Sequence, residues 1–139
     1  MNMTLNREPP ITLLQDDFNK LSNLAAVHSD SPVVKYLAHE LERAEIVTGL
    51  NAAARVVRLG SRVRFHDLAK PQPNDVVLVM PNDADIGKGF ISVLTPVGAA
   101  LLGLAEGQKI TFTLPNGADR TLAVLAVDQG QDDSMAARG

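Results

Sequence analysis

Cysteine is absent from the 139 residues, and aromatic side chains make up only 4% of them. The first absence excludes disulfides, thiolate metal sites and cysteine nucleophiles. The second leaves Leu, Val, Ile and Ala to build the core, and it disfavours an aromatic cage or a platform for stacking nucleic-acid bases. No apolar run approaches the ~20 residues of a membrane span, and "MNMTLNREPP" lacks the apolar segment of a signal peptide. We therefore expect a soluble, cytoplasmic protein that does not contact a membrane.

Charge is unevenly distributed along a chain whose net charge is −3. Residues 55–70 carry five basic side chains and one acidic one, between two acidic regions. A solvated strand face is one interpretation of this basic band; a docking surface for an acidic partner protein or an RNA backbone is the other. The sequence leaves both open. The arginines of this basic band are Arg55, Arg58, Arg62 and Arg64.

The first third of the chain has the period of helices. Thr12 is placed to cap a first helix, with Gln15 three residues on as in a capping box. Ser31 and Pro32 suit the N-cap and first position of a second helix, and Gly49 suits its end. Apolar residues share one face of each helix, so we predict an antiparallel hairpin. The two faces consist of Leu14, Phe18, Leu21 and Ala25, and of Val34, Leu37, Leu41 and Ala44.

From Arg55 the apolar period drops to two, which is typical of strands. The apolar run at 75–81 predicts a well-buried strand, 89–94 predicts another, and Asn116-Gly117 predicts a hairpin turn between two more. A short helix between Pro96 and Gly103 would cover this twisted antiparallel sheet. The expected class is α+β: a helical hairpin with a disordered start and a linker (1–54), a sheet domain (55–128) and a disordered tail (129–139).

Known catalytic and metal-binding patterns are missing. "GKG" at 87–89 is not followed by the Ser or Thr of a P-loop, and the glycines of 98–107 fit close packing and turns. The three histidines lack metal-ligand spacing. Asp83 and Asp85 fit a solvated turn better than a calcium loop. We predict no catalytic residue, no metal site and no cofactor.

The segment "GSRVRF" (60–65), together with the stretch at 81–127, resembles the C-terminal domain of the bacterial Gre transcript-cleavage factors. Within that superfamily the nearer match is Rnk, the family named for regulation of nucleoside diphosphate kinase, because "LAHELERAEIV" (37–47) and "TPVGAALLGL" (95–104) resemble its pattern. The resemblance covers about residues 12–128 and implies a coiled-coil hairpin joined to a domain with an FKBP-like fold. It also implies RNA polymerase as the partner, with the C-terminal domain on the rim of the secondary channel and the hairpin pointing inward. The candidate partner-binding residues are Thr95, Pro96 and the neighbouring Leu94, together with Arg62 and Arg64.

The expected hairpin tip contains His28 and Asp30. In Gre factors, acidic side chains at this tip hold a second metal ion in the polymerase, and one carboxylate on a ~22 Å arm is too little for that task. We therefore expect a monomeric, non-catalytic regulator that competes with Gre-type factors and touches nucleic acid at most indirectly, within the transcription complex. The alternatives are weak transcript cleavage through Asp30, regulation of nucleoside diphosphate kinase and, on fold alone, prolyl isomerisation.

Overall fold

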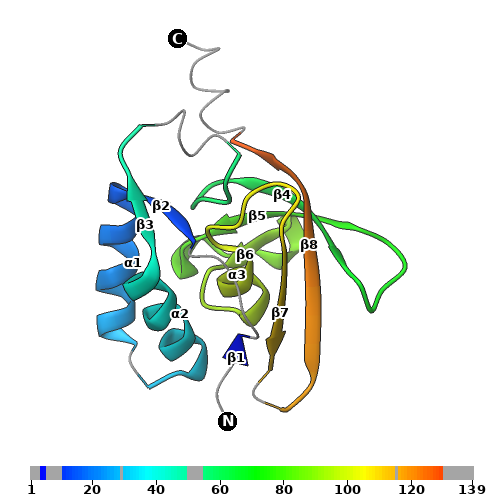
Figure 1. Cartoon of the computed structure of the whole chain (residues 1–139), viewed down its shortest axis with the longest axis horizontal. Coiled ribbons are helices and arrows are strands. Elements are labelled where there is room, and N and C mark those ends of the chain that lie inside the picture. Colours follow the sequence, from blue (N-terminus) through cyan, green and yellow to red (C-terminus); the bar gives the residue numbers. More distant parts are fainter. Residues whose placement is uncertain (1–3, 6–10, 29, 50–54, 115, 130–139) are drawn as a thin grey trace.

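The computed structural model describes residues 4–5, 11–28, 30–49, 55–114 and 116–129. Helices α1 and α2 stand beside a curled sheet that also packs against the short helix α3, so the α+β class is confirmed (Figure 1). No helix within these ranges is both long and apolar enough to cross a membrane. In chain order, the elements are β1 (Thr4–Leu5), β2 (Thr12–Leu14), α1 (Gln15–Val27), α2 (Pro32–Arg43), β3 (Glu45–Val47), β4 (Arg62–Asp67), β5 (Asn74–Val79), the 3-10 helices η2 (Pro81–Asp83) and η3 (Ile86–Lys88), β6 (Phe90–Ser92), α3 (Pro96–Leu101), β7 (Lys109–Thr113) and β8 (Asp119–Asp128).

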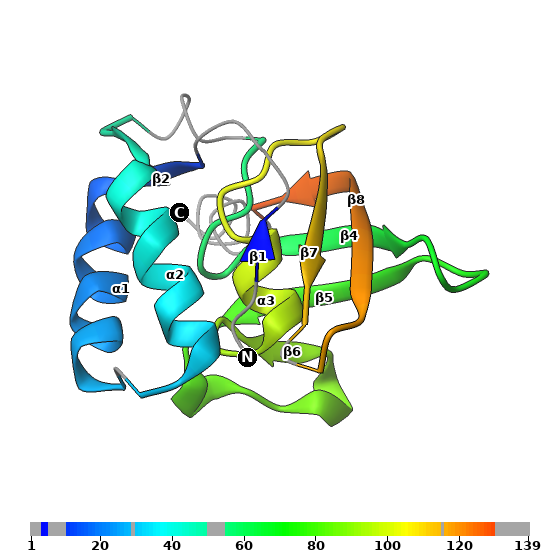
Figure 2. The ribbon, with the colours of Figure 1, turned by 60° about the horizontal axis from the view of Figure 1, so that its bottom comes forward.

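The helical hairpin forms as predicted, with α1 and α2 antiparallel and side by side (Figure 2). Ser31 caps α2, because its Oγ accepts hydrogen bonds from the backbone N–H groups of Val33 at 3.1 Å and Val34 at 3.4 Å. Pro32 occupies the first helical position, where its missing N–H costs nothing. Local chemistry therefore fixes where the second helix begins.

The predicted outer ends of both helices are wrong. Thr12 does not cap α1, which begins at Gln15 after Leu14, and no side-chain hydrogen bond caps it. Instead, β2 pairs in parallel with β3, the segment directly after α2, which itself ends at Arg43. Gly49 therefore terminates no helix. The linker predicted at the end of the segment 1–54 lies mostly outside the described residues.

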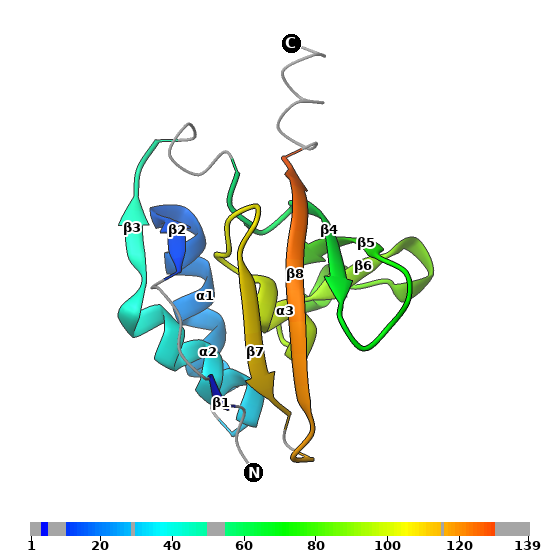
Figure 3. The same cartoon turned by 45° about the vertical axis from the view of Figure 1, so that its right-hand side comes forward.

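The main sheet has the strand order β1-β7-β8-β4-β5-β6. Every pair is antiparallel except β5 and β6, which are parallel, so the prediction of a wholly antiparallel sheet is wrong (Figure 3). The strand predicted to be well buried at 75–81 corresponds to β5, but most of its residues are exposed or half-buried and only Leu78 is fully buried. The predicted β7–β8 hairpin is confirmed, and its turn contains Gly117 at a φ of 91°, which favours glycine.

Helix α3 begins at Pro96 behind Thr95, as the sequence predicts. The Thr95 hydroxyl accepts a hydrogen bond from the Gly98 N–H at 3.0 Å and donates one to the Ser92 carbonyl at 2.8 Å. Gly98 lies so close to the chain before the helix that a Cβ there would be 2.2 Å from the Ser92 carbonyl oxygen. This glycine therefore permits the tight turn from β6 into α3.

The hairpin and the sheet share one hydrophobic core. Leu21 of α1 and Leu37 of α2 are fully buried in the same cluster as Leu78 and Phe112 of the sheet. α2 also lies against α3 (Figure 2). The two helices are therefore packed along the sheet module over their length rather than standing apart from it.

An ion pair ties the base of the hairpin to the sheet module. Arg58 Nε lies 3.4 Å from Asp17 Oδ2, and both side chains are largely buried. Burial raises the pKa of the Asp17 carboxyl, although Arg58 opposes that shift.

Just beyond β8, Gln129 accepts a hydrogen bond from the Ser61 hydroxyl at 2.6 Å and donates one to the Val56 carbonyl at 2.8 Å.

Candidate partner-binding surface

The hairpin tip places His28 and Asp30 on the surface. His28 caps the end of α1 through its backbone N–H, which donates to the Leu24 carbonyl at 3.1 Å, and its ring is exposed. Asp30 is also exposed and is the only acidic residue between Leu24 and Pro32. No group of three or more potential metal ligands gathers in the described ranges. The tip thus offers a single carboxylate.

The tip does not project beyond the sheet module. His28 and Val27 lie across a groove from Met80, the residue that follows β5. In Figure 2 the hairpin turn is level with the 3-10 helices that follow Met80. The hairpin therefore lies alongside the sheet module and does not extend past it.

The segment before α3 is partly core and partly surface. Leu94, Thr95 and Pro96 are each half-buried, and the apolar side chain of Leu94 packs against the core. Both hydrogen-bonding functions of the Thr95 hydroxyl are used inside the turn. The exposed parts of Leu94 and Pro96 are therefore apolar, and the hydrogen bonds of Thr95 fix the turn that carries them.

The structure divides the basic band. Arg58 is the buried link to α1, and Arg55 Nη1 pairs with Glu106 at 3.0 Å. Arg64 holds the Asp75 carboxylate with two hydrogen bonds of 2.8 and 3.0 Å, which lower the pKa of Asp75. Arg62 is exposed and forms no salt bridge within the described part of the chain, although its charge also helps to lower the pKa of Asp75. A partner can therefore pair with Arg62 directly, whereas Arg64 is partly neutralised by its neighbour.

A buried carboxylate reinforces the opposite side of β4. Asp67 pairs with Arg120 of β8 and accepts a hydrogen bond from the Ala69 N–H at 3.0 Å. Burial alone would raise the pKa of Asp67, but the Ala69 N–H and Arg120 together hold it below its usual value. This pair joins the two central strands β4 and β8, with the carboxylate buried and the Arg120 side chain partly exposed.

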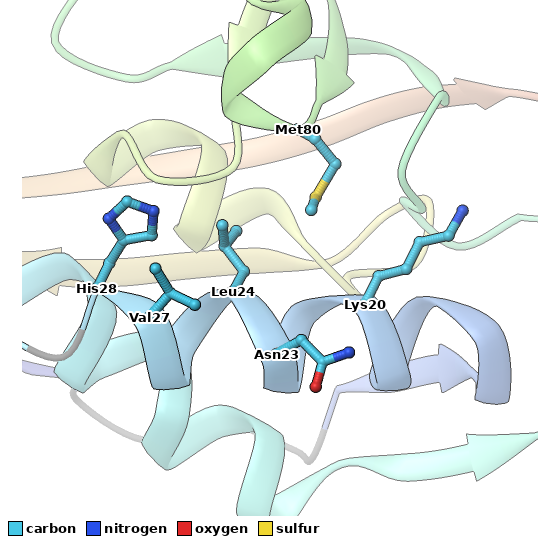
Figure 4. A pocket seen from close by; sticks show the side chains of 6 residues that line it. All are labelled: Lys20, Asn23, Leu24, Val27, His28 and Met80. Carbon is cyan, nitrogen blue, oxygen red and sulfur yellow. The ribbon is translucent and has the colours of Figure 1, made fainter.

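A groove beside α1 is a surface feature that the sequence does not predict. A shallow groove of about 350 Å³, here called the hairpin groove, lies between one face of α1 and the end of β5. Its side chains are Lys20, Asn23, Leu24, Val27, His28 and Met80 (Figure 4). The four α1 residues and the C-cap His28 have the spacing of one helix face, which can be read from the sequence. That Met80 stands opposite them is a tertiary fact that periodicity cannot reveal.

Comparisons with known proteins divide the chain at the same place as its local patterns. The family model described as "Transcription elongation factor, GreA/GreB, C-term" matches residues 52–129, and that described as "Rnk N-terminus" matches residues 9–47.

Individual relatives agree with both family matches. The Escherichia coli K12 protein "Regulator of nucleoside diphosphate kinase" is 36% identical over 97 residues, which are 70% of this chain and 71% of that protein. The Nitratidesulfovibrio vulgaris DP4 protein "Transcription elongation factor GreA" is 31% identical over 60% of this chain and 52% of its own length. A solved GreA/GreB elongation factor from Nitrosomonas europaea superposes with a TM-score of 0.70 at 34% identity, covering 87% of this chain and 99% of that one.

Proposed function

Because the chain belongs to the Rnk family of GreA/GreB-type transcription elongation factors, we propose that it is a non-catalytic regulator of transcription that binds RNA polymerase. The proposed site is the rim of the secondary channel, where it would compete with Gre-type cleavage factors. The observation that carries the non-catalytic part is the hairpin tip, which holds one carboxylate and lies across a groove from Met80 without projecting beyond the sheet module. We further propose that the hairpin is a coiled coil and that the sheet domain has an FKBP-like fold.

The geometry of the hairpin supports obstruction and not cleavage. Stimulated transcript cleavage needs carboxylates that complete a two-metal site, and these must be delivered to the polymerase active centre. Helix α2 has 12 residues, so its length is only about 18 Å at ~1.5 Å per residue. One side of α2 packs against α3 and the sheet. The hairpin therefore cannot extend further from the sheet module without exposing the side chains that it buries in the shared core.

The docking surface that we propose is centred on Leu94 and Pro96, with Arg62 as the charge available to an acidic partner. Replacing Pro96 by Glu tests this. Glu at the first position of a helix interacts favourably with the helix dipole, so the fold should persist, while an apolar contact is lost. We expect Pro96→Glu to weaken polymerase binding by about tenfold. Pro73→Glu, the same exchange at an exposed loop position, is the matched control and should bind like wild type.

The decisive experiment combines binding with cleavage. The full chain is titrated against core RNA polymerase, then against polymerase already carrying a labelled Gre-type factor. We expect binding at micromolar concentration and displacement of the labelled factor. Backtracked elongation complexes incubated with the chain should show no shortening of the RNA 3′ end. Shortening that disappears in Asp30→Ala would establish weak cleavage and overturn the non-catalytic assignment, and absence of binding would overturn the polymerase assignment.

A second candidate function follows from the name of the E. coli relative, "Regulator of nucleoside diphosphate kinase". It is tested by assaying purified nucleoside diphosphate kinase with and without the chain. We expect no change in kinase activity, because an effect on kinase levels can arise through transcription. A change that depends on the concentration of the chain would favour direct regulation.

A further inference from the structure

The hairpin groove has the composition of a protein-docking site. Leu24, Val27 and Met80 give it an apolar surface, and Figure 4 shows Leu24 and the Met80 thioether facing one another across it. Val27 is 75% exposed although it is a large apolar residue. Valine is also a poorer helix former than alanine, so neither burial nor helix propensity explains its place in the last turn of α1.

Hydrogen-bond donors at the two ends of the groove indicate what would bind there. Lys20 stands at one end and His28 at the other, and none of the six lining residues is acidic. Both side chains donate hydrogen bonds to carboxylates. Asp17, which feels the charge of Lys20 but is itself paired with Arg58, and Asp30 lie on either side along the chain without lining the groove. In a chain with a net charge of −3, this is a local apolar strip with hydrogen-bond donors at its ends.

The size of the groove limits its occupant. Lys20 and His28 are separated by two turns of helix, or about 12 Å. That length accommodates a short segment with one or two apolar side chains, as when an amphipathic helix lies in a groove. It is too short for a whole interface, because stable protein interfaces bury roughly 800 Å² on each partner. The groove therefore suits a secondary contact beside a larger docking surface.

We propose that the hairpin groove binds an acidic, apolar segment of RNA polymerase, as a second contact that adds to the one at Leu94 and Pro96. This rests on the proposed function, since it takes the same partner. The apolar side chain of that segment would pack between Leu24 and Met80, and its carboxylate would accept hydrogen bonds from Lys20 or His28. The contact would fix the hairpin against the polymerase, in addition to the anchorage through the sheet module.

Adjacent positions of α1 provide a matched test. Val27→Asp and Ala26→Asp place the same charge in the same exposed helical turn, but only Val27 lines the groove. We expect Val27→Asp to weaken binding to core polymerase by about tenfold and Ala26→Asp by less than about twofold. Lys20→Glu should weaken it severalfold, whereas Lys35→Glu on exposed α2 surface should not. Circular dichroism checks that each variant is folded.

Methionine labelling locates the contact independently. The chain has four methionines, and Met80 is the one within the described residues, so its ¹³C-methyl signal can be assigned with Met80→Leu. In the polymerase complex this signal should shift or broaden. An unchanged Met80 signal, or equal binding by Val27→Asp and Ala26→Asp, overturns the groove while a weakened Pro96→Glu preserves the proposed function. Weakening by Lys20→Glu alone would point to a nucleic acid or another purely charged contact and also overturns it. A wild-type chain that does not bind overturns both proposals.

Discussion

Replacing Gly98 by Ala should destabilise the protein, contrary to the usual effect of this exchange inside a helix. The added Cβ would lie 2.2 Å from the Ser92 carbonyl oxygen and 2.9 Å from Thr95 Oγ1. Ordinary van der Waals contact is near ~3.5 Å, so the turn and α3 must separate by about 1 Å. Overpacking of this kind costs ~1–3 kcal/mol, and disturbing the Thr95 cap adds about 1 kcal/mol. The better helix propensity of alanine stabilises the folded protein by only ~1 kcal/mol.

The net expectation is a loss of roughly 2 kcal/mol in the free energy of unfolding, or a fall in Tm of about 4–8 °C. Chemical denaturation followed by circular dichroism measures it. The control is Gly49→Ala, because an added Cβ there meets nothing within 4 Å and its φ is not positive. That variant should gain up to ~1 kcal/mol through a less disordered unfolded state. If Gly98→Ala matched or exceeded wild-type stability, the close approach that shapes the docking segment would be refuted.

Two further changes test the shared core and the electrostatics of the sheet. Leu37→Ala truncates a fully buried side chain of α2 and should cost ~2–5 kcal/mol in a single unfolding transition; separate transitions for helices and sheet would contradict one core. Asp67→Asn tests the lowered pKa of Asp67. The ionised Asp67 carboxylate stabilises the folded protein above the pKa that Asp67 has in the unfolded chain, and this stabilisation is lost as the pH falls through its lower pKa in the folded protein. The variant should therefore be less stable than wild type near pH 7, and the difference should shrink in acid. Denaturant titrations at several pH values measure this, and a constant difference would contradict the assignment.

Signals that act over a few residues could be predicted from the sequence. Ser31 and Pro32 mark the start of α2, Thr95 and Pro96 mark the start of α3, and Asn116-Gly117 marks the β7–β8 turn, because each satisfies or relieves a backbone requirement nearby. The strand face of Arg62 and Arg64 was likewise visible from alternation. Such features depend on neighbours in sequence and not on the rest of the fold.

Features that depend on distant segments could not be predicted. Thr12 looks like a helix cap until its partner strand, more than thirty residues later, draws it into a parallel pair. The parallel strand β6 is decided by how the chain returns to β5 after η2 and η3. Arg64 is seen as free positive charge until Asp75 is placed opposite it. The hairpin groove has the same origin, since Met80 reaches α1 only in the folded chain.

The pairing of β2 with β3 has a consequence for how such proteins can diversify. Strand β2 leads into α1 and β3 follows α2, so their pairing holds the two helices together at the base of the hairpin. The spacing and direction of the helices at this base therefore do not depend on the length of the helices or on the turn between them. Seven residues added to each helix would carry the turn about 10 Å further, past Met80 and into open solvent, with the base untouched. A change in helix length alone would convert a hairpin that ends level with the sheet module into one that projects beyond it.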